Sequence, residues 1–335
     1  MLTVWGYSGV AASATEVFTQ EAKLQALDTA TGADGWNPPE LVQGGVSSTG
    51  WEDSADISPD GKTLSFMYVA VDVLAWVSQA GADPARFGEF QGGPDRGNNP
   101  PFSVDFFSAE VLPDGSTKTP VRFPFSKDNR SEWGGMRDLE GNWFFVVTEL
   151  SGFNPDIYRN EDRFPINTSF EEDDPHFDSQ SKTLFFDTDN RPDTLDPTNE
   201  KKDILMSKET SPGVWSAPVL LNPPINLAKT DDRQAHFTPD GALYFSSDRR
   251  GGALAIYKSK RLGGNSWTEP VKVVGPPPEL QPTPGGLLLA AVGEPTLTLS
   301  GTLYFVALFF HPPTQAFDLD IARMTRKNLS GVTFR

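Results

Sequence analysis

The sequence predicts an all-β fold, a single β-propeller of four-stranded antiparallel blades that spans residues 1–335. Three observations predict it: one hairpin sequence recurs along the chain, third and fourth strands follow it in several copies, and turn residues are abundant. The chain has 30 Gly and 29 Pro, which indicate many tight turns in a sequence with strand patterning. Its 24 Phe, 8 Trp and 6 Tyr can fill a large core.

The recurring hairpin is clearest at residues 235–245, where Pro239, Asp240 and Gly241 form the turn. Proline fixes φ, and glycine takes the position that needs a positive φ, so this turn is suited to a hairpin. Residues 175–186 repeat the pattern with one extra residue and with Ser181 at the glycine position. The other copies are residues 55–66 and, more weakly, 135–145 and 295–305.

A second unit follows the hairpins. Residues 255–260 and 266–273 are expected to be a third and a fourth strand, and residues 203–208 and 214–221 match both. Further third strands are expected at 105–108, 156–159 and 318–323. Repeated units of this kind are typical of propellers, in which radial repetition leaves only short sheet edges.

The N-terminal region joins the pattern out of phase. Residues 2–7, 16–20 and 36–42 resemble a second, a third and a fourth strand without a preceding first strand. We therefore expect six blades, the sixth left short or closed by a strand near residues 332–335, with five blades as the alternative. The predicted division is a partial blade at 1–50 and successive blades at 51–126, 127–169, 170–226, 227–275 and 276–335.

The Pro-Asp-Gly hairpin, the Asp-Ile-Tyr third strand at 156–158 and the Trp-x-x-Pro fourth strand resemble the WD40-like repeat of TolB-type propellers. Residues 236–270, with Ser-Ser-Asp-Arg at 246–249, are the closest match, and the resemblance covers nearly the whole chain. It implies the propeller fold. It leaves the function open, because the family includes binding modules, scaffolds, peptidase-associated propellers and some carbohydrate lyases.

Composition limits the partners. The formal net charge of −17 repels phosphate backbones, so no nucleic acid is expected as a ligand. There is no apolar run long enough to span a membrane, and the absence of cysteine excludes disulfides and thiolate metal sites. A secreted or periplasmic location is favoured, although residues 1–9 do not have the pattern of a signal peptide.

Two loops are candidate binding elements. The insertion at 69–104 is long enough to be functional, although it could equally be a flap without function, and it contributes Trp76, Arg86 and Arg96 as candidate ligand contacts. The second loop is the acidic segment 187–196. Asp187 and Asp189 there could bind calcium, and the alternative is a solvated loop with Asx turns.

Alignment of the repeats places one residue of each first strand at an equivalent position. We call this set the inner ring: Asp56, Met136, His176, His236 and Thr296. Asp174, Gln234 and Glu294 form a partial second layer, and Glu52, Glu132, Glu172 and Asp232 are equivalent to one another just upstream. His311, the third histidine, falls in a loop on the same face.

Imidazoles and carboxylates that converge on a channel suit two chemistries. His176, His236 and His311 could hold a divalent metal, either calcium or a transition metal with help from carboxylates. His176, His236, Asp174 and Glu294 could instead supply a general acid and base, with the upstream carboxylates, Asp56 and Gln234 binding the ligand. The alternative is structural, because polar residues on inner strands commonly hydrogen-bond the adjacent blade.

These observations predict a propeller that binds a protein, peptide or glycan on its loop-rich face. The alternative is a carbohydrate-active lyase or hydrolase that uses a histidine and carboxylate site at the channel mouth. A structural scaffold is a third hypothesis. No nucleophile elbow, phosphate loop or His-Glu-x-x-His motif is present.

Overall fold

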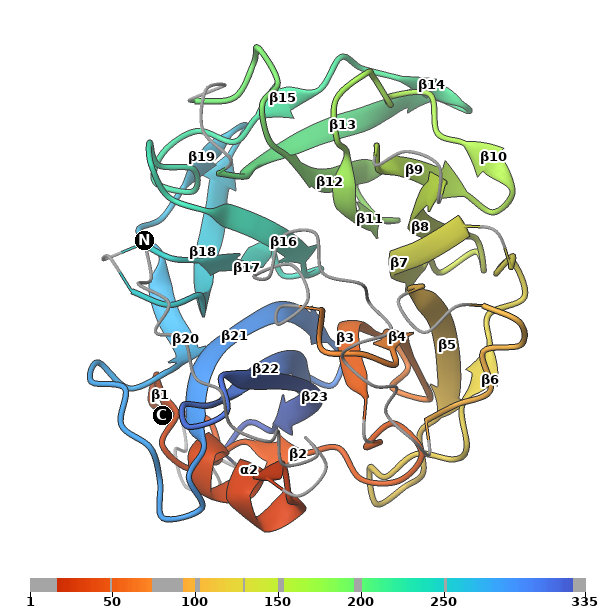
Figure 1. The fold of residues 1–335 in the computed structure, drawn as a ribbon. Coiled ribbons are helices and arrows are strands. Elements are labelled where there is room, and N and C mark those ends of the chain that lie inside the picture. The colour runs from red at the N-terminus through yellow and green to blue at the C-terminus, as the bar shows by residue number, and fades with distance from the viewer. Residues whose placement is uncertain are drawn as a thin grey trace.

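The structure is a computed structural model that describes residues 17–48, 50–73, 93–99, 103–128, 130–149, 154–195, 201–249 and 252–327. These residues form five β-sheets that surround a central axis as the blades of a propeller (Figure 1). The first strand of each blade lies at the axis, and neighbouring first strands contact one another around the ring. The propeller prediction is confirmed, and the observed number of blades is the smaller of the two expected.

The strands follow the blades in chain order. The first blade has β3 (Trp51–Ile57), β4 (Thr63–Val69), β5 (Asp105–Glu110) and β6 (Val121–Arg122). The second has β7 (Arg130–Arg137), β8 (Trp143–Glu149), β9 (Asp156–Arg159) and β10 (Asp162–Arg163). The third has β11 (Asp173–Asp178), β12 (Thr183–Thr188), β13 (Asp203–Ser211), β14 (Val214–Trp215) and β15 (Val219–Leu220). The fourth has β16 (Asp232–Phe237), β17 (Ala242–Ser247), β18 (Ala255–Gly263), β19 (Ser266–Trp267) and β20 (Val271–Gly275). The fifth has β21 (Leu288–Leu297), β22 (Leu303–His311) and β23 (Ala316–Met324).

The N-terminal segment completes existing blades. Strand β2 (Glu40–Leu41) pairs with β23 and is the fourth strand of the fifth blade, while β1 (Thr31–Gly32) extends the fourth blade beyond β20. The expectation of a sixth blade was therefore wrong for the described residues. An unattached strand in the sequence does not reveal which sheet it joins, and here an N-terminal strand closes the ring against the last blade.

Residues 17–20 also differ from the predicted third strand, because helix α2 (Gln20–Leu27) begins there. The Thr19 hydroxyl accepts a hydrogen bond from the backbone N–H of Ala22 at 3.2 Å and so caps the helix. Ala26 and Leu27 are fully buried against the fifth blade, and Lys23 is buried beside Asp318 and Asp320 of β23.

The hairpin turns follow the predicted chemistry. Gly61, Gly141, Gly241 and Gly301 all have a positive φ, between 74° and 89°. The third hairpin differs by one residue, because Lys182 at φ 53° takes the left-handed position expected for Ser181. Asp178 supports that turn by accepting the backbone N–H of Ser181 at 2.9 Å.

Each interface between neighbouring blades has its own hydrophobic cluster in the described part of the chain. Aromatic pairs join the sheets across the interfaces: Phe144 stacks on Phe177 at 4.9 Å, and Phe185 stacks on Phe237 at 5.2 Å. Burial of each such ring stabilises the fold by about 1.5–3 kcal/mol. The core is thus a ring of five inter-blade layers, which leaves the axis itself to polar groups.

No helix within the described ranges is long and apolar enough to cross a membrane.

Candidate functional site

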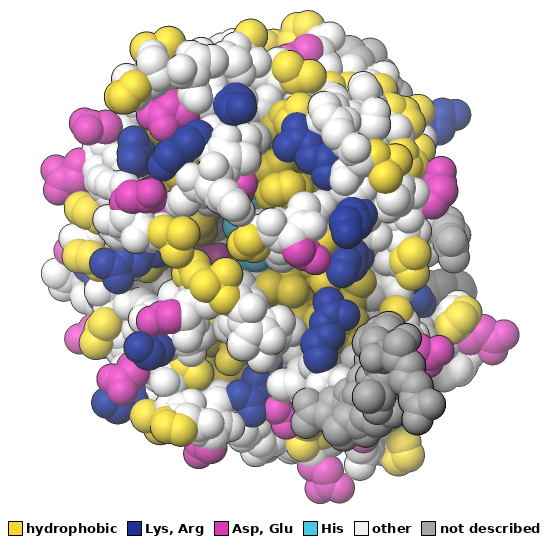
Figure 2. Space-filling view, turned by 180° about the vertical axis from the view of Figure 1, so that it is seen from behind, with side chains coloured by type: hydrophobic (Ala, Val, Ile, Leu, Met, Phe, Trp, Pro, Cys, Tyr) yellow, Lys and Arg dark blue, Asp and Glu magenta, His cyan; other side chains and the backbone are white. Residues whose placement is uncertain are grey.

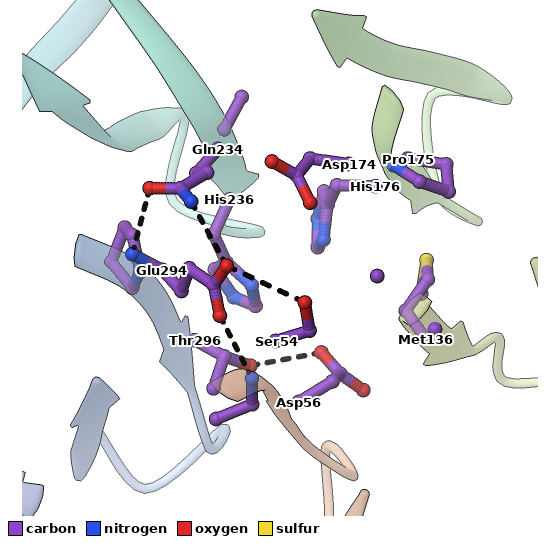
Figure 3. A pocket seen from close by; sticks show the side chains of 15 residues that line it. Ser54, Asp56, Met136, Asp174, Pro175, His176, Gln234, His236, Glu294 and Thr296 are labelled. Atoms are coloured by element: carbon purple, nitrogen blue, oxygen red, sulfur yellow. Dashed lines mark hydrogen bonds between the residues drawn. The ribbon is translucent and has the colours of Figure 1, made fainter. Parts of the chain in front are cut away.

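The axis holds a chamber that all five inner strands line (Figure 3). Its empty space, counted together with the solvent at its open mouth, is about 380 Å³. Each inner strand contributes three consecutive residues to its wall: 54–56, 134–136, 174–176, 234–236 and 294–296. The inner ring, as predicted from the repeats, contributes the last residue of each triplet. The first residue of each triplet belongs to a second layer, which we call the bulge positions: Ser54, Gly134, Asp174, Gln234 and Glu294.

All five bulge positions have a left-handed backbone. Their φ values lie between 44° and 57°, and the register of every inner hairpin shifts at this point. Only Gly134 adopts this conformation freely, whereas each of the other four residues carries a strain of about 1–3 kcal/mol. The bulge recurs at one layer of all five blades and turns these side chains toward the axis. Strain of the kind that the four non-glycine residues carry concentrates at functional sites.

Glu294 is held by its neighbours on both sides. Its Oε1 accepts a hydrogen bond from the Gln234 amide at 2.9 Å, and its Oε2 accepts the backbone N–H of Ala55 at 3.1 Å. The Glu294 carboxyl group also lies within hydrogen-bonding reach of Asp53. Burial, Asp53 and Asp174 raise the pKa of Glu294 well above its usual value. Burial raises the pKa of Asp53 as well.

Asp174 differs from Glu294 in having no side-chain hydrogen bond to any described residue. Its carboxyl group points into the chamber between Gln234 and His176 (Figure 3). Burial raises its pKa well above the usual value, and the nearby charges of Asp173 and Asp187 raise it further. A strained, unpartnered carboxyl group with a raised pKa in a chamber is the arrangement expected of an acid that acts on a ligand.

Behind Asp174 lies a cluster of carboxylates around one ammonium group. Lys202 Nζ is 2.5 Å from Asp173, 2.8 Å from Glu171 and 3.1 Å from Asp187. Burial opposes the Lys202 charge, but these carboxylates outweigh it and raise the pKa of Lys202. Oxygens of Asp173, Asp174 and Asp187 are close enough together to hold a metal ion. The Lys202 ammonium already supplies the positive charge at this place.

The inner ring links each blade to the next. The Asp56 carboxylate accepts the backbone N–H of Arg137, and the Met136 sulfur accepts that of Phe177 at 2.8 Å. Thr296 closes the circle, because its hydroxyl accepts the backbone N–H of Ile57 at 3.2 Å. The hydrogen bonds of the two histidines complete this inter-blade set.

The two histidines use opposite tautomers. His176 Nε2 lies 3.1 Å from the carbonyl oxygen of Phe237, which can only accept, so this nitrogen carries the proton. His236 Nε2 lies 3.3 Å from the backbone N–H of Leu297, which can only donate, so the proton is on Nδ1. Burial lowers the pKa of His176 to about 4 and that of His236 well below its usual value, so both rings are neutral.

This arrangement bears on the predicted histidine metal site. The ring centroids of His176 and His236 are 4.2 Å apart, but His236 has no free lone pair for a metal while it keeps its bond to Leu297. His311 lies at the end of β22, where its Nδ1 is 2.7 Å from the Thr314 hydroxyl. The structure brings His176 and His236 together and leaves His311 away from the chamber wall.

The upstream carboxylates, predicted as ligand contacts, are buried behind the chamber. Each accepts hydrogen bonds from the loop that precedes its strand: Glu52 from Ser48, Glu132 from Lys127, Glu172 from Thr168 and Asp232 from Leu227. Arginines pair with three of them, Arg130 with Glu132, Arg191 with Glu172 and Arg249 with Asp232. The four residues do not line the chamber, and their contacts fix the inter-blade loops.

The remaining predicted residues are dispersed. Asp187 accepts the backbone N–H of Gln234 at 2.9 Å, whereas Asp189 is half-buried on the following loop. Arg96 contacts the carbonyl oxygen of Asn99 at 3.5 Å. Trp76 and Arg86, and with them most of the insertion at 69–104, lie outside the described residues.

The sequence interpretation missed Asp53, Asp173 and Lys202. Asp53 and Asp173 directly precede bulge positions, and the bulge brings them near the chamber although strand alternation alone would turn them away. One signal existed, since Gly134 at the equivalent place indicates a left-handed position.

The chain was compared with known proteins. No family model and no curated protein matches the chain. A thermostable family-43 glycoside hydrolase superposes with a TM-score of 0.49 at 11% identity, over 85% of this chain and 92% of that one. An N-acetylgalactosamine deacetylase from F. plautii gives 0.48 at 8% identity, over 89% and 96%. A putative TolB from Agrobacterium tumefaciens gives 0.37 at 12% identity, over 81% and 80%.

Proposed function

We propose that the chamber binds a sugar residue and that the protein is a glycoside hydrolase in which Asp174 is the general acid. The observation that carries this proposal is the Asp174 carboxyl group. It projects into the chamber from a residue with a strained left-handed backbone, it has no hydrogen-bond partner among the described residues, and its pKa is raised. A general acid must keep its proton near neutral pH until it transfers it to the leaving oxygen.

We assign the role of the second catalytic carboxylate to the pair formed by Asp53 and Glu294. We assign one proton to this pair, which leaves one negative charge beside the chamber. That charge can stabilise an oxocarbenium-like transition state or activate a water, which are the roles of the second carboxylate in glycosidases. Asp174 raises the pKa of Glu294, so the two sites are electrostatically linked.

The wall chemistry supports a neutral, hydroxyl-rich ligand. Ser54, Gln234 and Thr296 contribute hydroxyl and amide groups, and no lysine or arginine is among the described residues that line the chamber. The likeness to a glycoside hydrolase concerns the fold alone, so the proposal rests on the chamber.

The test is hydrolysis of a panel of aryl glycosides by the wild type, Asp174→Asn and Glu294→Gln. Asp162→Asn is the matched control, because Asp162 is an exposed carboxylate on β10. We expect Asp174→Asn to lose about 10²–10⁴-fold in kcat/KM. The loss should shrink for dinitrophenyl leaving groups, which need no protonation. A wild type that turns over no member of the panel, or an unaffected Asp174→Asn variant, would show the proposal to be wrong.

Recognition of a protein, peptide or glycan on the loop-rich face stays a prediction, since much of the insertion lies outside the described residues. Sugar binding without turnover in the same panel, unchanged by Asp174→Asn, would favour that function.

A further inference from the structure

We propose that the opposite mouth of the channel is a second ligand site, which takes a small uncharged aromatic molecule that carries a hydrogen-bonding group. This inference does not depend on the proposed hydrolase, because the second mouth has its own walls and opening. The two spaces share only inner-ring residues, because Asp56, Met136, His176 and His236 line both.

The second mouth is a funnel enclosed by the hairpin turns. Its empty space, counted together with the solvent at its open mouth, is about 540 Å³. Figure 2 shows the hollow near the middle of this face with histidine at its base. Its walls are apolar side chains from the ends of four inner strands: Ile57, Phe177, Phe237 and Leu297. Its rim is formed by equivalent turn residues: Pro59, Leu139, Ser179, Pro239 and Leu299. Its base includes His176, His236, Asp56 and Met136.

Two residues of the rim have no evident folding role. Pro59 and Pro239 fix the backbone of their turns, but Leu139 and Leu299 stand at the same position with 67% of their surface exposed. Unlike proline, leucine does not fix the backbone of a turn, and an exposed leucine side chain contributes little burial to the stability of the fold. Apolar groups gathered around a concave opening are typical of a surface that covers an apolar ligand.

The carboxylates of the funnel already accept hydrogen bonds within the protein, and Asp56 at its base accepts one from the Thr296 hydroxyl at 2.9 Å. Asp138 accepts the backbone N–H of Asn142 at 2.7 Å, and Asp178 accepts that of Ser181 at 2.9 Å, so both carboxylates belong to turns. The Arg137 guanidinium lies 5.9 Å from the centre of the Trp143 ring. The walls therefore favour an uncharged ligand.

The base supplies the polar contact. His176 has a proton on Nε2 and hence an acceptor at Nδ1, whereas His236 has a proton on Nδ1. No described residue forms a hydrogen bond with either Nδ1 atom. The two rings lie side by side, with their centroids 4.2 Å apart. One acceptor and one donor on neighbouring rings suit a hydroxyl group or a ring N–H, and the apolar walls suit the aromatic ring that bears it.

The experiment is ligand-observed NMR titration with phenol and indole as probes and toluene as the probe that lacks a polar group. We expect saturable binding of phenol and indole and at least tenfold weaker binding of toluene. Leu299→Asp and Leu139→Asp should each weaken phenol and indole binding at least tenfold. Leu262→Asp is the matched control, because Leu262 is 69% exposed on the β18–β19 hairpin, outside the funnel, and it should leave binding unchanged.

Three results would overturn the inference. The first is a lack of saturable binding by phenol and indole. The second is an equal loss of binding in Leu262→Asp. The third is a loss in Asp174→Asn, which would place the ligand in the first chamber. Retained binding in Asp174→Asn with loss in Leu299→Asp supports a separate site whether or not the protein hydrolyses glycosides.

Discussion

Gln234 and Glu294 hold each other through two reciprocal hydrogen bonds. The Gln234 amide donates to Glu294 Oε1 at 2.9 Å, and the backbone N–H of Glu294 donates to Gln234 Oε1 at 3.2 Å. Both residues have a left-handed backbone, and they belong to neighbouring blades. The pair therefore fixes a carboxyl group at the chamber wall while joining the fourth blade to the fifth.

The first prediction concerns this pair. Gln234→Glu replaces the amide donor with a carboxylate, so the free energy of unfolding should fall by about 1–3 kcal/mol at neutral pH. Protonation of the new carboxyl group restores a donor, so the loss should diminish toward about pH 4, near the usual pKa of Glu. Urea denaturation at both pH values checks this. Gln180→Glu, on an exposed turn, is the control, and an equal loss there would contradict the prediction.

The second prediction is that Asp174→Asn stabilises the fold. The folded state raises the pKa of Asp174, so it binds more protons than the unfolded state and stability falls as pH rises through the folded pKa. Asparagine removes that penalty and tolerates φ 44°. We expect a gain of roughly 0.5–2 kcal/mol at neutral pH that vanishes below about pH 4. Thermal unfolding against pH would show it, and a pH-independent difference would refute the assigned cause.

The repeats predicted much of this site, and the reason is geometric. Residues at equivalent strand positions face the same way, so alignment alone could assign His176 and His236 to one layer and Asp174 and Glu294 to another. Alignment contained a single sign of the bulge, Gly134, because the other four bulge residues are not glycine. It could not find Lys202, since the ammonium meets its carboxylates only after three strands of the blade have assembled.

The blade number shows a second limit. The strand pattern near residues 36–42 was recognised, but its partner is β23, at the other end of the chain. Local periodicity identifies a strand and contains no information about which distant edge it joins. Only the structure shows that β2 closes the ring by pairing with β23.

The third prediction isolates His176. Because its folded pKa of about 4 lies below the usual 6.5, its contribution to stability is complete above pH 6.5 and is lost as pH falls through 4. The shift corresponds to roughly 3 kcal/mol. His176→Gln keeps a donor for Phe237 and does not titrate, so the stability of the wild type relative to this variant should drop by that amount between neutral pH and about pH 4. Chemical denaturation across this range is the measurement. His311→Gln, at a far less buried ring, should show a much smaller change; an equal change would argue against the inner-ring explanation.

The fourth prediction concerns Lys202. Lys202→Met leaves Asp173, Asp187 and Glu171 without their counter-charge, which should cost about 3–5 kcal/mol at neutral pH. The vacated position lies among oxygens that can hold a hard cation, so millimolar Ca²⁺ should restore part of the stability of the variant. Thermal unfolding with and without Ca²⁺ tests both statements.

The neighbouring residue provides the control for that experiment. Lys201 pairs with Asp248 at 2.5 Å but has 40% of its side chain exposed, so Lys201→Met should cost less than about 1 kcal/mol and gain nothing from Ca²⁺. A wild type that is itself stabilised by Ca²⁺ to the same degree as Lys202→Met would contradict the role given to the ammonium.

The last prediction concerns ring closure. Lys23 of α2 lies 2.6 Å from both Asp318 and Asp320, and all three side chains are at least 94% buried. Burial alone would lower the pKa of Lys23, but Asp320 and Asp318 outweigh it and raise the pKa. Removal of the ammonium would leave two carboxylates buried without a counter-charge, so Lys23→Met should cost about 3–5 kcal/mol.

The strands in which the variant loses protection from hydrogen exchange provide the sharper test of ring closure. Helix α2 and β2 attach the N-terminal segment to the fifth blade, so hydrogen exchange in Lys23→Met should accelerate in β2 and β21–β23 before it does in β7–β10. Lys62→Met removes an ion pair of 3.5 Å between side chains that are 77% and 57% exposed, and it should change neither stability nor exchange appreciably. Uniform acceleration over all blades would mean that Lys23 supports the fold as a whole. Acceleration confined to the fifth blade would show that the contact between Lys23 and β23 attaches the N-terminal segment to the last blade and so closes the ring.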